Sequence, residues 1–276
     1  MNDLGSNYEI VRTRDGAPAM LDRTTGEVMH PIVGPLVEAA ALYVGPCQLA
    51  ARLATPASEP LVLLDVGLGA GSNAIAAWTV SEAMPSAARR LELVSFDATL
   101  EPLAVALDSD DARAFGFDAD ASVAAHGLIA RGEHETPRTR WRVHVADLEA
   151  ALRAQPPESA DIVFWDPFSP RANPTLWSVA AFTALRRLCR AGATVHTYSA
   201  ATAVRSSLLL TGFAVGLGPA APGRQPQTTV AALEPGQLAA PLDRRWLERL
   251  ARSSAGFAPD APPDALAQIG RLAQFQ

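Results

Sequence analysis

The sequence has no lysine, so all 23 of its positive charges are arginines, against 29 acidic residues. The net charge of −6 argues against a strongly basic surface of the kind that binds nucleic acid through phosphates. A nucleic-acid substrate would therefore need a local basic strip. Two groups of arginines are candidates for it: Arg186, Arg187 and Arg190, and Arg131, Arg138, Arg140 and Arg142.

Cysteine and long apolar runs are also scarce. Cys47 and Cys189 lie far apart and show no CxxC or Cys/His spacing, so we predict two buried thiols, no disulfide framework and no metal site. No apolar run approaches the roughly 18 residues that a membrane span requires. The first residues lack the basic and apolar regions of a signal peptide. We therefore expect a cytoplasmic protein that does not enter a membrane.

The 276 residues are 49% hydrophobic, which is enough for one elaborated α/β domain with small appendages. Turn signals at Arg14-Asp15-Gly16 and Thr24-Thr25-Gly26 predict a small antiparallel extension. We therefore divide the chain into an N-terminal β extension with a first helix (1–45), a main domain (46–235) and a helical, proline-rich tail (236–276).

Asp166 follows a short apolar run, Ile162-Val-Phe-Trp165, which is typical of a buried strand in a parallel sheet. Ligands of open α/β sheets bind beyond the carboxyl ends of the strands, where Asp166 would lie. Pro167 and Pro170 stiffen the following loop and leave carbonyl groups free to accept hydrogen bonds. Asp166 is thus either a reactive carboxylate or a helix-capping residue in a proline turn.

A second informative stretch is Asp65-Val-Gly67-Leu-Gly69-Ala-Gly71-Ser-Asn73, which follows the apolar residues 61–64 and precedes a helix-forming segment. Glycines allow positive φ angles and close approach of a ligand, and the helix start offers unpaired N–H groups. The GxGxG spacing differs from the GxGxxG of dinucleotide sites and is the arrangement of S-adenosylmethionine methyltransferases. We therefore predict that this loop binds S-adenosylmethionine through Gly67, Gly69, Gly71 and Asn73.

Two further acidic residues end predicted strands. Asp97 follows Leu91–Phe96, where it would bind both ribose hydroxyls of the cofactor or cap the next helix. Asp147 follows an alternating strand that begins at Trp141, and in the methyltransferase layout it would lie beside the adenine. Together with Asp166 these acids complete the predicted cofactor site. The fold class is then a Rossmann-like class I methyltransferase with a seven-stranded, mostly parallel sheet and helices on both faces.

With these motifs in place, the chain resembles the methyltransferase domain of the tRNA 5-methylaminomethyl-2-thiouridine biosynthesis protein family over most of residues 12–233. The stretches that carry the resemblance are Asp166-Pro-Phe-Ser-Pro-Arg-Ala-Asn173-Pro-Thr-Leu-Trp177, Gly69-Ala-Gly71-Ser-Asn73 with Trp78, Ser95-Phe96-Asp97, Tyr198-Ser199 with Val204-Arg205, and, near the start, Asp15-Gly16, Gly26-Glu27, His30 and Glu38.

The resemblance implies N-methylation of an amine on the wobble uridine of tRNA, of the 5-aminomethyl-2-thiouridine type. Asp166 would be the catalytic acceptor of the amine's N–H groups, assisted by free carbonyls of its loop. Phe168 and Trp177 would provide apolar walls or a stacking surface for the substrate ring. The full set of expected substrate-binding residues is His30, Phe168, Asn173, Trp177, Tyr198 and Arg224.

Two departures from the family pattern bear on its partners. The family has a basic loop before the last strand that is thought to meet RNA, whereas this chain has Gly223-Arg224-Gln-Pro-Gln-Thr. Bifunctional members also carry a flavin oxidase domain, for which this chain is too short, so a separate flavin oxidase would act upstream. Two other functions stay open: an aminopropyl transferase of the spermidine synthase type, and a cofactor-binding protein without catalysis.

Overall fold

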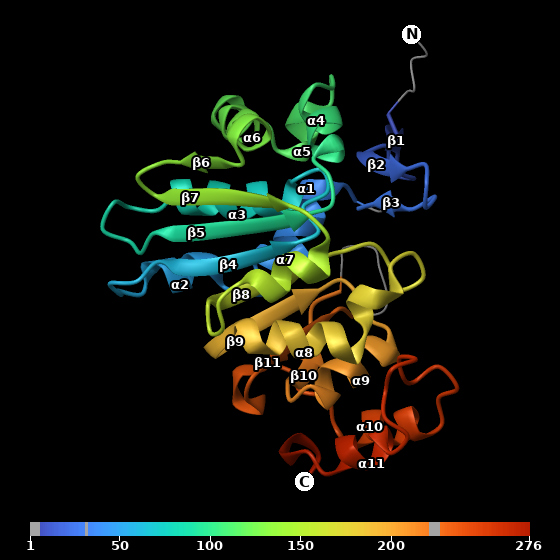
Figure 1. Ribbon diagram of the computed structural model, residues 1–276. Helices are drawn as coiled ribbons and strands as arrows, with labels where there is room; N and C mark the ends of the chain where they lie inside the picture. Colours follow the sequence, from blue (N-terminus) through green and yellow to red (C-terminus); the bar gives the residue numbers. More distant parts are fainter. Residues whose placement is uncertain (1–5, 31–32, 221–226) are drawn as a thin grey trace.

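The computed structural model describes residues 6–30, 33–220 and 227–276, which form one large sheet, one small sheet and the surrounding helices (Figure 1). The strands of the small sheet are β1 (Tyr8–Arg12), β2 (Pro18–Asp22) and β3 (Val28–Met29). Those of the large sheet are β4 (Leu61–Val66), β5 (Leu91–Asp97), β6 (Glu133–Glu135), β7 (Thr139–Val145), β8 (Ala160–Trp165), β9 (Cys189–Thr197), β10 (Ala214–Leu217) and β11 (Thr229–Ala232).

The helices connect these strands and form the tail. The α-helices are α1 (Pro35–Ala39), α2 (Leu49–Ala54), α3 (Ser72–Glu82), α4 (Glu101–Leu107), α5 (Ala112–Phe115), α6 (Ala119–Arg131), α7 (Leu148–Ala154), α8 (Val179–Leu188), α9 (Thr202–Leu210), α10 (Arg244–Ala251) and α11 (Ala265–Gly270). A π-helical turn, η1 (Ala40–Val44), continues α1, and short 3₁₀ turns are η2 (Pro174–Trp177), η3 (Pro235–Gln237) and η4 (Ala273–Phe275).

The order of strands in the large sheet is β10-β11-β9-β8-β4-β5-β7-β6. The strands from β9 to β7 are parallel, while β11, β10 and β6 run antiparallel to their neighbours. The chain winds outward from β4 in both directions, so β4 and β8 flank the point where the order reverses. In open α/β sheets a crevice forms there, at the carboxyl ends of the strands.

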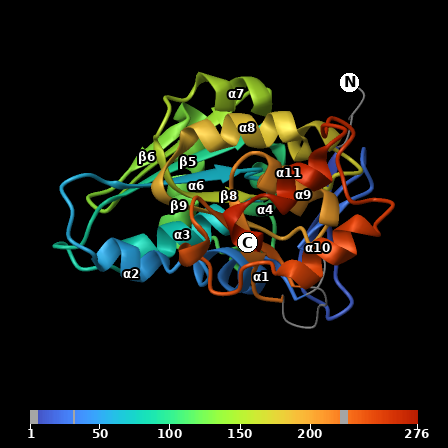
Figure 2. The same ribbon diagram turned by 90° about the horizontal axis from the view of Figure 1, so that it is seen from below.

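Alternating side chains of the central strands divide the core into two layers. Leu63, Ile162 and Phe164 pack on one face with apolar residues of α2, α3 and α6. Val66 and Trp165 belong to the other face, with residues of α7, α8 and α9. Figure 2 shows α7 and α8 on one side of the sheet and α1, α2 and α3 on the other. The predicted three-layer fold, with helices on both faces, is confirmed.

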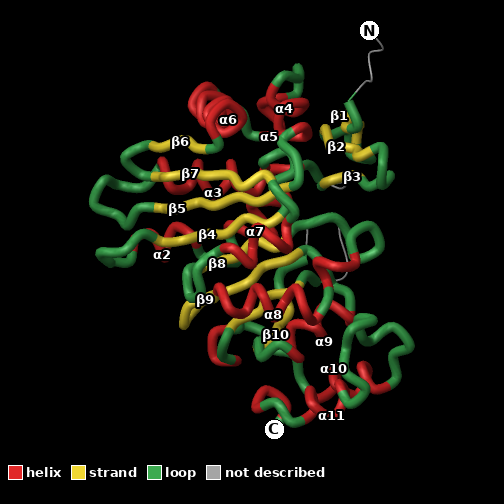
Figure 3. The backbone as a smooth tube through the Cα atoms, viewed as in Figure 1, coloured by secondary structure: helices red, strands yellow, loops and turns green. Residues whose placement is uncertain are grey.

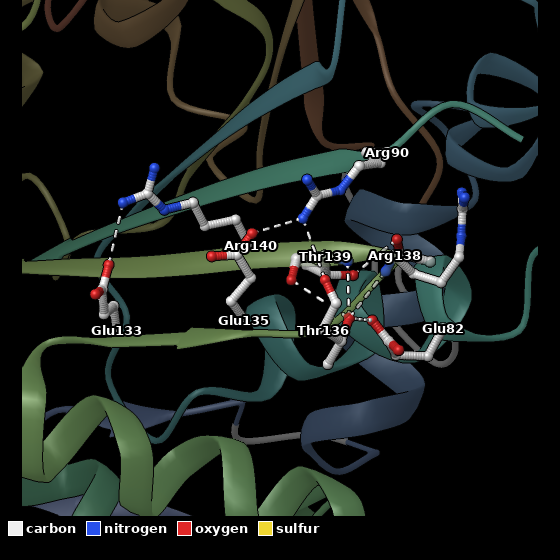
Figure 4. Close-up of polar contacts among 9 residues, drawn as sticks. Glu82, Arg90, Glu133, Glu135, Thr136, Arg138, Thr139 and Arg140 are labelled. Atoms are coloured by element: carbon white, nitrogen blue, oxygen red, sulfur yellow. Dashed lines mark hydrogen bonds and ion pairs between the residues drawn. The ribbon is translucent and has the colours of Figure 1, made fainter. Parts of the chain in front are cut away.

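The sheet has one strand more than predicted in the described part of the chain. Strand β6 contains only Glu133, His134 and Glu135, so it offers no apolar alternation by which the sequence could reveal it. It pairs with β7 and lies at the edge, where Glu133 binds Arg140 and Glu135 binds Arg90 (Figure 4). Charged side chains on an edge strand discourage pairing with another chain.

The first helix that the sequence predicts within residues 1–45 is divided in the described residues, because five of them, Ala40–Val44, form the π-helical turn η1. Helix α8 ends at Leu188, because Cys189 is already extended. Gly192, with φ 83°, lies inside β9.

The tail packs along the outer edge of β10. The Gln274 side chain donates to the carbonyl oxygens of Val215 (2.6 Å) and Leu242 (2.9 Å) and accepts from the Val215 N–H (2.9 Å). Phe275 stacks on Trp246 at a centroid distance of 6.2 Å. The hydrogen bonds of Gln274 thus pair with backbone groups of Val215 on the edge of β10 that faces away from β11.

Among the described residues, no helix is long and apolar enough to span a bilayer.

We predict that Gln274→Ala lowers the free energy of unfolding by about 1–3 kcal/mol, because the Val215 N–H and the Leu242 carbonyl lose their Gln274 partner. The Val215 carbonyl keeps its bond from the Leu242 N–H. Denaturant midpoints measure the effect. Gln268→Ala is the matched control, since within the described part of the chain the exposed Gln268 side chain bonds only Asp264, and it should change stability by less than about 0.5 kcal/mol. Equal midpoints for the two variants would contradict this role of the tail.

Candidate active site

A cavity of about 330 Å³ opens at the carboxyl ends of β4, β5 and β8. Figure 3 shows that the loops after these strands gather at one end of the sheet, beside the small sheet β1–β3. The lining comes from the small sheet and the segment after it (Tyr8, Glu27, Val28, Met29, His30, Glu38, Leu42 and Tyr43), from the ends of β4 and β5 (Gly67–Ala70 and Asp97–Thr99), and from Leu148, residues 166–169, Asn173 and Tyr198. The cavity is therefore closed on one side by the N-terminal extension.

Asp166 is held at this cavity by two donors from other elements. The Tyr43 hydroxyl donates to Oδ1 at 2.6 Å, and the Asn73 amide donates to Oδ2 at 2.6 Å. Burial raises the pKa of Asp166, while His30, Tyr43 and Asn73 oppose that rise. Each carboxylate oxygen can accept more than one hydrogen bond, so both remain available to a ligand. Asp166 is thus a positioned acceptor, and it caps no helix.

The loop after Asp166 is stiffened by its own hydrogen bonds as well as by its prolines. The carbonyl oxygen of Pro167 accepts from the Tyr198 hydroxyl at 3.1 Å, and that of Phe168 accepts from the Trp177 indole at 2.8 Å. Both carbonyls therefore already accept a hydrogen bond from a side chain, in contrast to the expectation that they stay free for the substrate. Ser169 donates its N–H (2.9 Å) and its hydroxyl to the Glu27 carboxylate.

Gly67 allows the ends of β4 and β8 to approach each other. Its φ is 91°, and a Cβ atom there would lie 2.6 Å from the carbonyl oxygen of Asp166. Any side chain at this position would have to displace the Asp166 backbone. The first glycine of the motif is therefore required by the geometry of the reactive loop as well as by its own turn.

Asp97 and the second glycine form a cradle suited to the ribose of the cofactor. The Gly69 N–H donates to Asp97 Oδ2 at 2.8 Å, and the Ala98 N–H donates to Oδ1 at 2.7 Å. Burial raises the pKa of Asp97, and these backbone donors oppose the rise. The carboxylate is fixed by its neighbours and keeps lone pairs for two hydroxyl groups. This donor and acceptor set fits an adenosyl cofactor with an unmodified ribose.

The cavity is strongly acidic. Glu27, Glu38, Asp97 and Asp166 line it, and among the described lining residues His30 is the only one with a basic side chain. Behind them lies Asp65, which is 1% exposed and accepts from Ser95 at 2.8 Å. Burial raises the pKa of Asp65 to about 8, because the charges of Asp166 and Asp97 add to the loss of solvent. Such a cavity favours ligands that carry positive charge.

The structure brings most of the predicted site residues to this cavity. His30, Gly67, Gly69, Asp97, Asp166, Phe168, Asn173 and Tyr198 line it. Asn73 and Trp177 are buried beside it and hold Asp166 and Phe168, while Gly71 precedes the first residue of α3. Asp147 is outside the lining and exposed: its side chain accepts from Ala150 N and caps α7. Arg224 lies outside the described residues.

Tyr43 is a site residue that the sequence does not reveal, and Glu27 belongs to the family resemblance but receives no role at the site from the sequence. Tyr43 lies in an apolar segment without a motif, and the π-helical turn that carries it cannot be foreseen from periodicity. Glu27 follows a turn in the small sheet, where acidic residues are common on the surface. The thiols of Cys47 and Cys189 are buried, as predicted, and burial raises the pKa of each to about 12.

We predict that Gly67→Ala loses methyl transfer, because its Cβ forces Asp166 away from Tyr43 and Asn73. The positive φ adds a strain of about 1–3 kcal/mol to the free energy of folding. Gly16→Ala is a matched control, since Gly16 also has a positive φ (82°) but has no atom within 4 Å of an added Cβ. Loss of activity in both variants, or in neither, would contradict the proposed role of the close contact between Gly67 and the Asp166 backbone.

Asp97→Asn should weaken binding of S-adenosylmethionine about tenfold to a hundredfold, since one hydrogen bond from a ribose hydroxyl to a charged acceptor contributes about 1.5–3 kcal/mol. Titration calorimetry measures the affinity. Asp147→Asn serves as the comparison because Asp147 lies outside the cavity lining. Unchanged affinity in Asp97→Asn would contradict the assignment of the ribose acceptor.

Comparison with known proteins places the chain in a family. A model described as S-adenosyl-L-methionine-dependent methyltransferase matches residues 122–234. The tRNA 5-methylaminomethyl-2-thiouridine biosynthesis bifunctional protein MnmC of Methylibium petroleiphilum is 33% identical over 276 residues, which cover 95% of this chain and 41% of that protein. The protein of the same name from Cupriavidus necator is 32% identical over 255 residues, with coverages of 88% and 38%. The chain thus spans about two fifths of these relatives.

Solved structures agree with this relationship. The crystal structure of MNMC2 from Aquifex aeolicus superposes with a TM-score of 0.73 at 26% identity, covering 98% of this chain and 88% of that one. A spermidine synthase in complex with the transition-state analogue AdoDATO reaches a TM-score of 0.51 at 12% identity, covering 96% and 85%, which concerns the fold alone. The chain is an S-adenosyl-L-methionine-dependent methyltransferase and belongs with the methyltransferase domain of the tRNA 5-methylaminomethyl-2-thiouridine biosynthesis proteins.

Proposed function

We propose that this methyltransferase acts on a primary amine, and that the amine belongs to a wobble uridine of the 5-aminomethyl-2-thiouridine type in tRNA. The observation that carries the proposal is Asp166, a partly buried carboxylate held by Tyr43 and Asn73 at the wall of an acidic cavity. A carboxylate in this setting accepts N–H bonds from an amine and stabilises the positive charge that develops on its nitrogen.

The charge of the cavity supports an amine over an acidic or neutral acceptor. A protonated amine enters a region that contains several carboxylates and one histidine, so its desolvation is offset by direct attraction. An acceptor with its own carboxylate would be repelled by Glu27, Glu38 and Asp166. The same field suits the cofactor, whose sulfonium carries a positive charge.

The chemical step needs little more than orientation and proton removal. When bound, the cofactor supplies an electrophilic methyl group. Asp166 orients the amine so that its lone pair faces that group. A new N–C bond forms as the S–C bond breaks, and the nitrogen must lose a proton to become a neutral secondary amine. Asp166 is the first acceptor for that proton.

The curated relatives carry tRNA in their printed names, which supports a tRNA acceptor. Most arginines of the two clusters that could form a basic strip have partners within the protein. Arg140, Arg142 and Arg190 pair with Glu133, Glu92 and Asp161, while Arg138 and Arg187 donate to backbone carbonyls. Phosphate contacts would thus come from other exposed arginines, such as Arg131 at the end of α6 or Arg171 in the loop after β8.

The proposal also implies an upstream partner. The relatives are named as bifunctional proteins and extend well beyond the matched part. In this proposal an oxidase of the flavin class supplies the free amine that the methyltransferase consumes.

Mass spectrometry of tRNA nucleosides from a strain without the gene tests the acceptor. We expect the unmethylated aminomethyl uridine to accumulate and its methylated form to disappear, and expression of the wild-type protein should reverse both. A nucleoside profile identical to that of the parent strain would exclude tRNA as the acceptor and would leave a small-molecule amine as the substrate class.

Asp166→Ala should bind S-adenosylmethionine with an affinity within a few fold of wild type and lose methyl transfer by about 10²-fold or more. In the wild type, activity should fall as the pH drops through the raised pKa of Asp166, because protonation removes the acceptor. Asp161→Ala is the matched control, since Asp161 pairs with Arg190 away from the cavity lining. Near-normal turnover of Asp166→Ala would refute the proposed role.

A further inference from the structure

His30 has an unusual backbone conformation at the edge of the cavity. Its φ is 53°, in the left-handed region that residues other than glycine rarely adopt, although histidine, asparagine and aspartate tolerate it better than most. Its side chain is 14% exposed. A strained backbone persists where the surrounding structure holds it, and such residues cluster at functional sites. The conformation places the imidazole between two carboxylates.

The His30 imidazole lies between the carboxylates of Asp166 and Glu38. Its Nε2 lies 3.9 Å from Asp166 Oδ2, and its Nδ1 lies 3.7 Å from Glu38 Oε2. The titratable groups around it are Glu38 from α1, Tyr43 from η1, Asp65 from β4, Asp166 after β8, and Glu27 from the same small sheet. Burial alone would lower the pKa of His30, but Glu38 and Asp166 reverse that effect and the pKa is raised.

The reaction needs a route for a proton out of the cavity. A primary amine reaches the site mostly as an ammonium ion, so it must lose one proton before it can attack, and methyl transfer then gives a secondary ammonium ion. Asp166 is only 14% exposed and already accepts from two donors, so it can serve repeated turnovers only if it passes that proton on. His30 is the lining residue whose ordinary pKa suits that task.

We propose that His30 is the proton acceptor behind Asp166, taking the substrate's proton at Nε2 and releasing the proton on Nδ1 toward Glu38. This inference rests on the proposed amine methyl transfer. The proton balance is complete: the N–H bond of the substrate breaks and an N–H bond forms on the imidazole. Glu38, which is only 3% exposed but lines the cavity, then transfers the released proton to solvent that enters the cavity. No oxidant or further reactant takes part.

The distances allow this path after a small adjustment. A contact of 3.9 Å is too long for a direct hydrogen bond, so one water molecule or a slight rotation of the imidazole must close it. Catalytic hydrogen bonds in ligand-free sites are often longer than in the complex with substrate. The opposite role, a permanent imidazolium that keeps Asp166 ionised, predicts the opposite pH dependence, since activity would then fall as His30 loses its proton.

Two variants separate His30 as acceptor from His30 as a structural residue. His30→Asn keeps a residue that tolerates positive φ. We expect it to lower the turnover number about 10²-fold at neutral pH, with a smaller deficit at high pH, where the amine is deprotonated in solution. His30→Gly relieves the strain and opens space, and added imidazole should restore at least about a tenth of the lost activity.

His126→Asn is the matched control, because His126 is an exposed histidine on α6 whose side chain, among the described residues, bonds only the Ser122 carbonyl. The pH profile of methyl transfer by this variant should equal that of the wild type. A deficit in His30→Asn that is the same at every pH, together with no rescue of His30→Gly by imidazole, would overturn the relay. So would turnover of His30→Asn at the wild-type level, or a wild-type rate that falls as His30 deprotonates.

A second measurement does not depend on activity. In NMR titrations of ¹⁵N-histidine-labelled protein, the His30 midpoint should lie above that of a free histidine and should decrease in both Asp166→Asn and Glu38→Gln. A His30 titration midpoint that stays unchanged in Asp166→Asn or in Glu38→Gln would overturn the relay, even if the protein catalyses methyl transfer. A midpoint that responds to both changes, in a protein that methylates no amine, would instead count against the proposed function.

Discussion

The close passage of Gly67 beneath Asp166 is the constraint on which the site depends. Strands β4 and β8 are neighbours at the point where the order of the sheet reverses, so their carboxyl ends meet at one crevice. Only a residue without a side chain lets the loop after β4 run under the Asp166 backbone. The cofactor loop and the reactive loop are therefore set by a single contact, and a shift in one moves the other.

The N-terminal extension completes the cavity that this contact begins. Glu27 fixes the loop after Asp166, His30 reaches the carboxylate itself, and Tyr43 from the following π-helical turn holds it from the other side. Residues separated by more than 120 positions in the chain thus meet around one carboxylate. Several acids gathered at low exposure explain both the raised pKa of Asp166 and the preference for cations that we infer.

The sequence predicted the parts of this arrangement that depend on local pattern. The apolar run before Asp166, the glycines after Asp65 and the acid at the end of β5 each have a local physical signature, and the structure has them at strand ends. It could not predict what depends on packing between distant elements. Tyr43 has no motif and β6 has no apolar alternation. The hydrogen bonds from Tyr198 and Trp177 to the carbonyl oxygens of Pro167 and Phe168 join residues that are 31 and 9 positions apart, and no local pattern indicates them.

The central claim is that Asp166 presents an amine of a nucleoside for methylation. The most direct measurement supplies purified protein with S-adenosylmethionine labelled in its methyl group and tRNA from cells that lack the gene, and locates the label by fragmentation of the nucleosides. The account predicts that the label appears on the exocyclic nitrogen of one modified uridine. Label on a carbon, on a ring nitrogen or on an oxygen would contradict it.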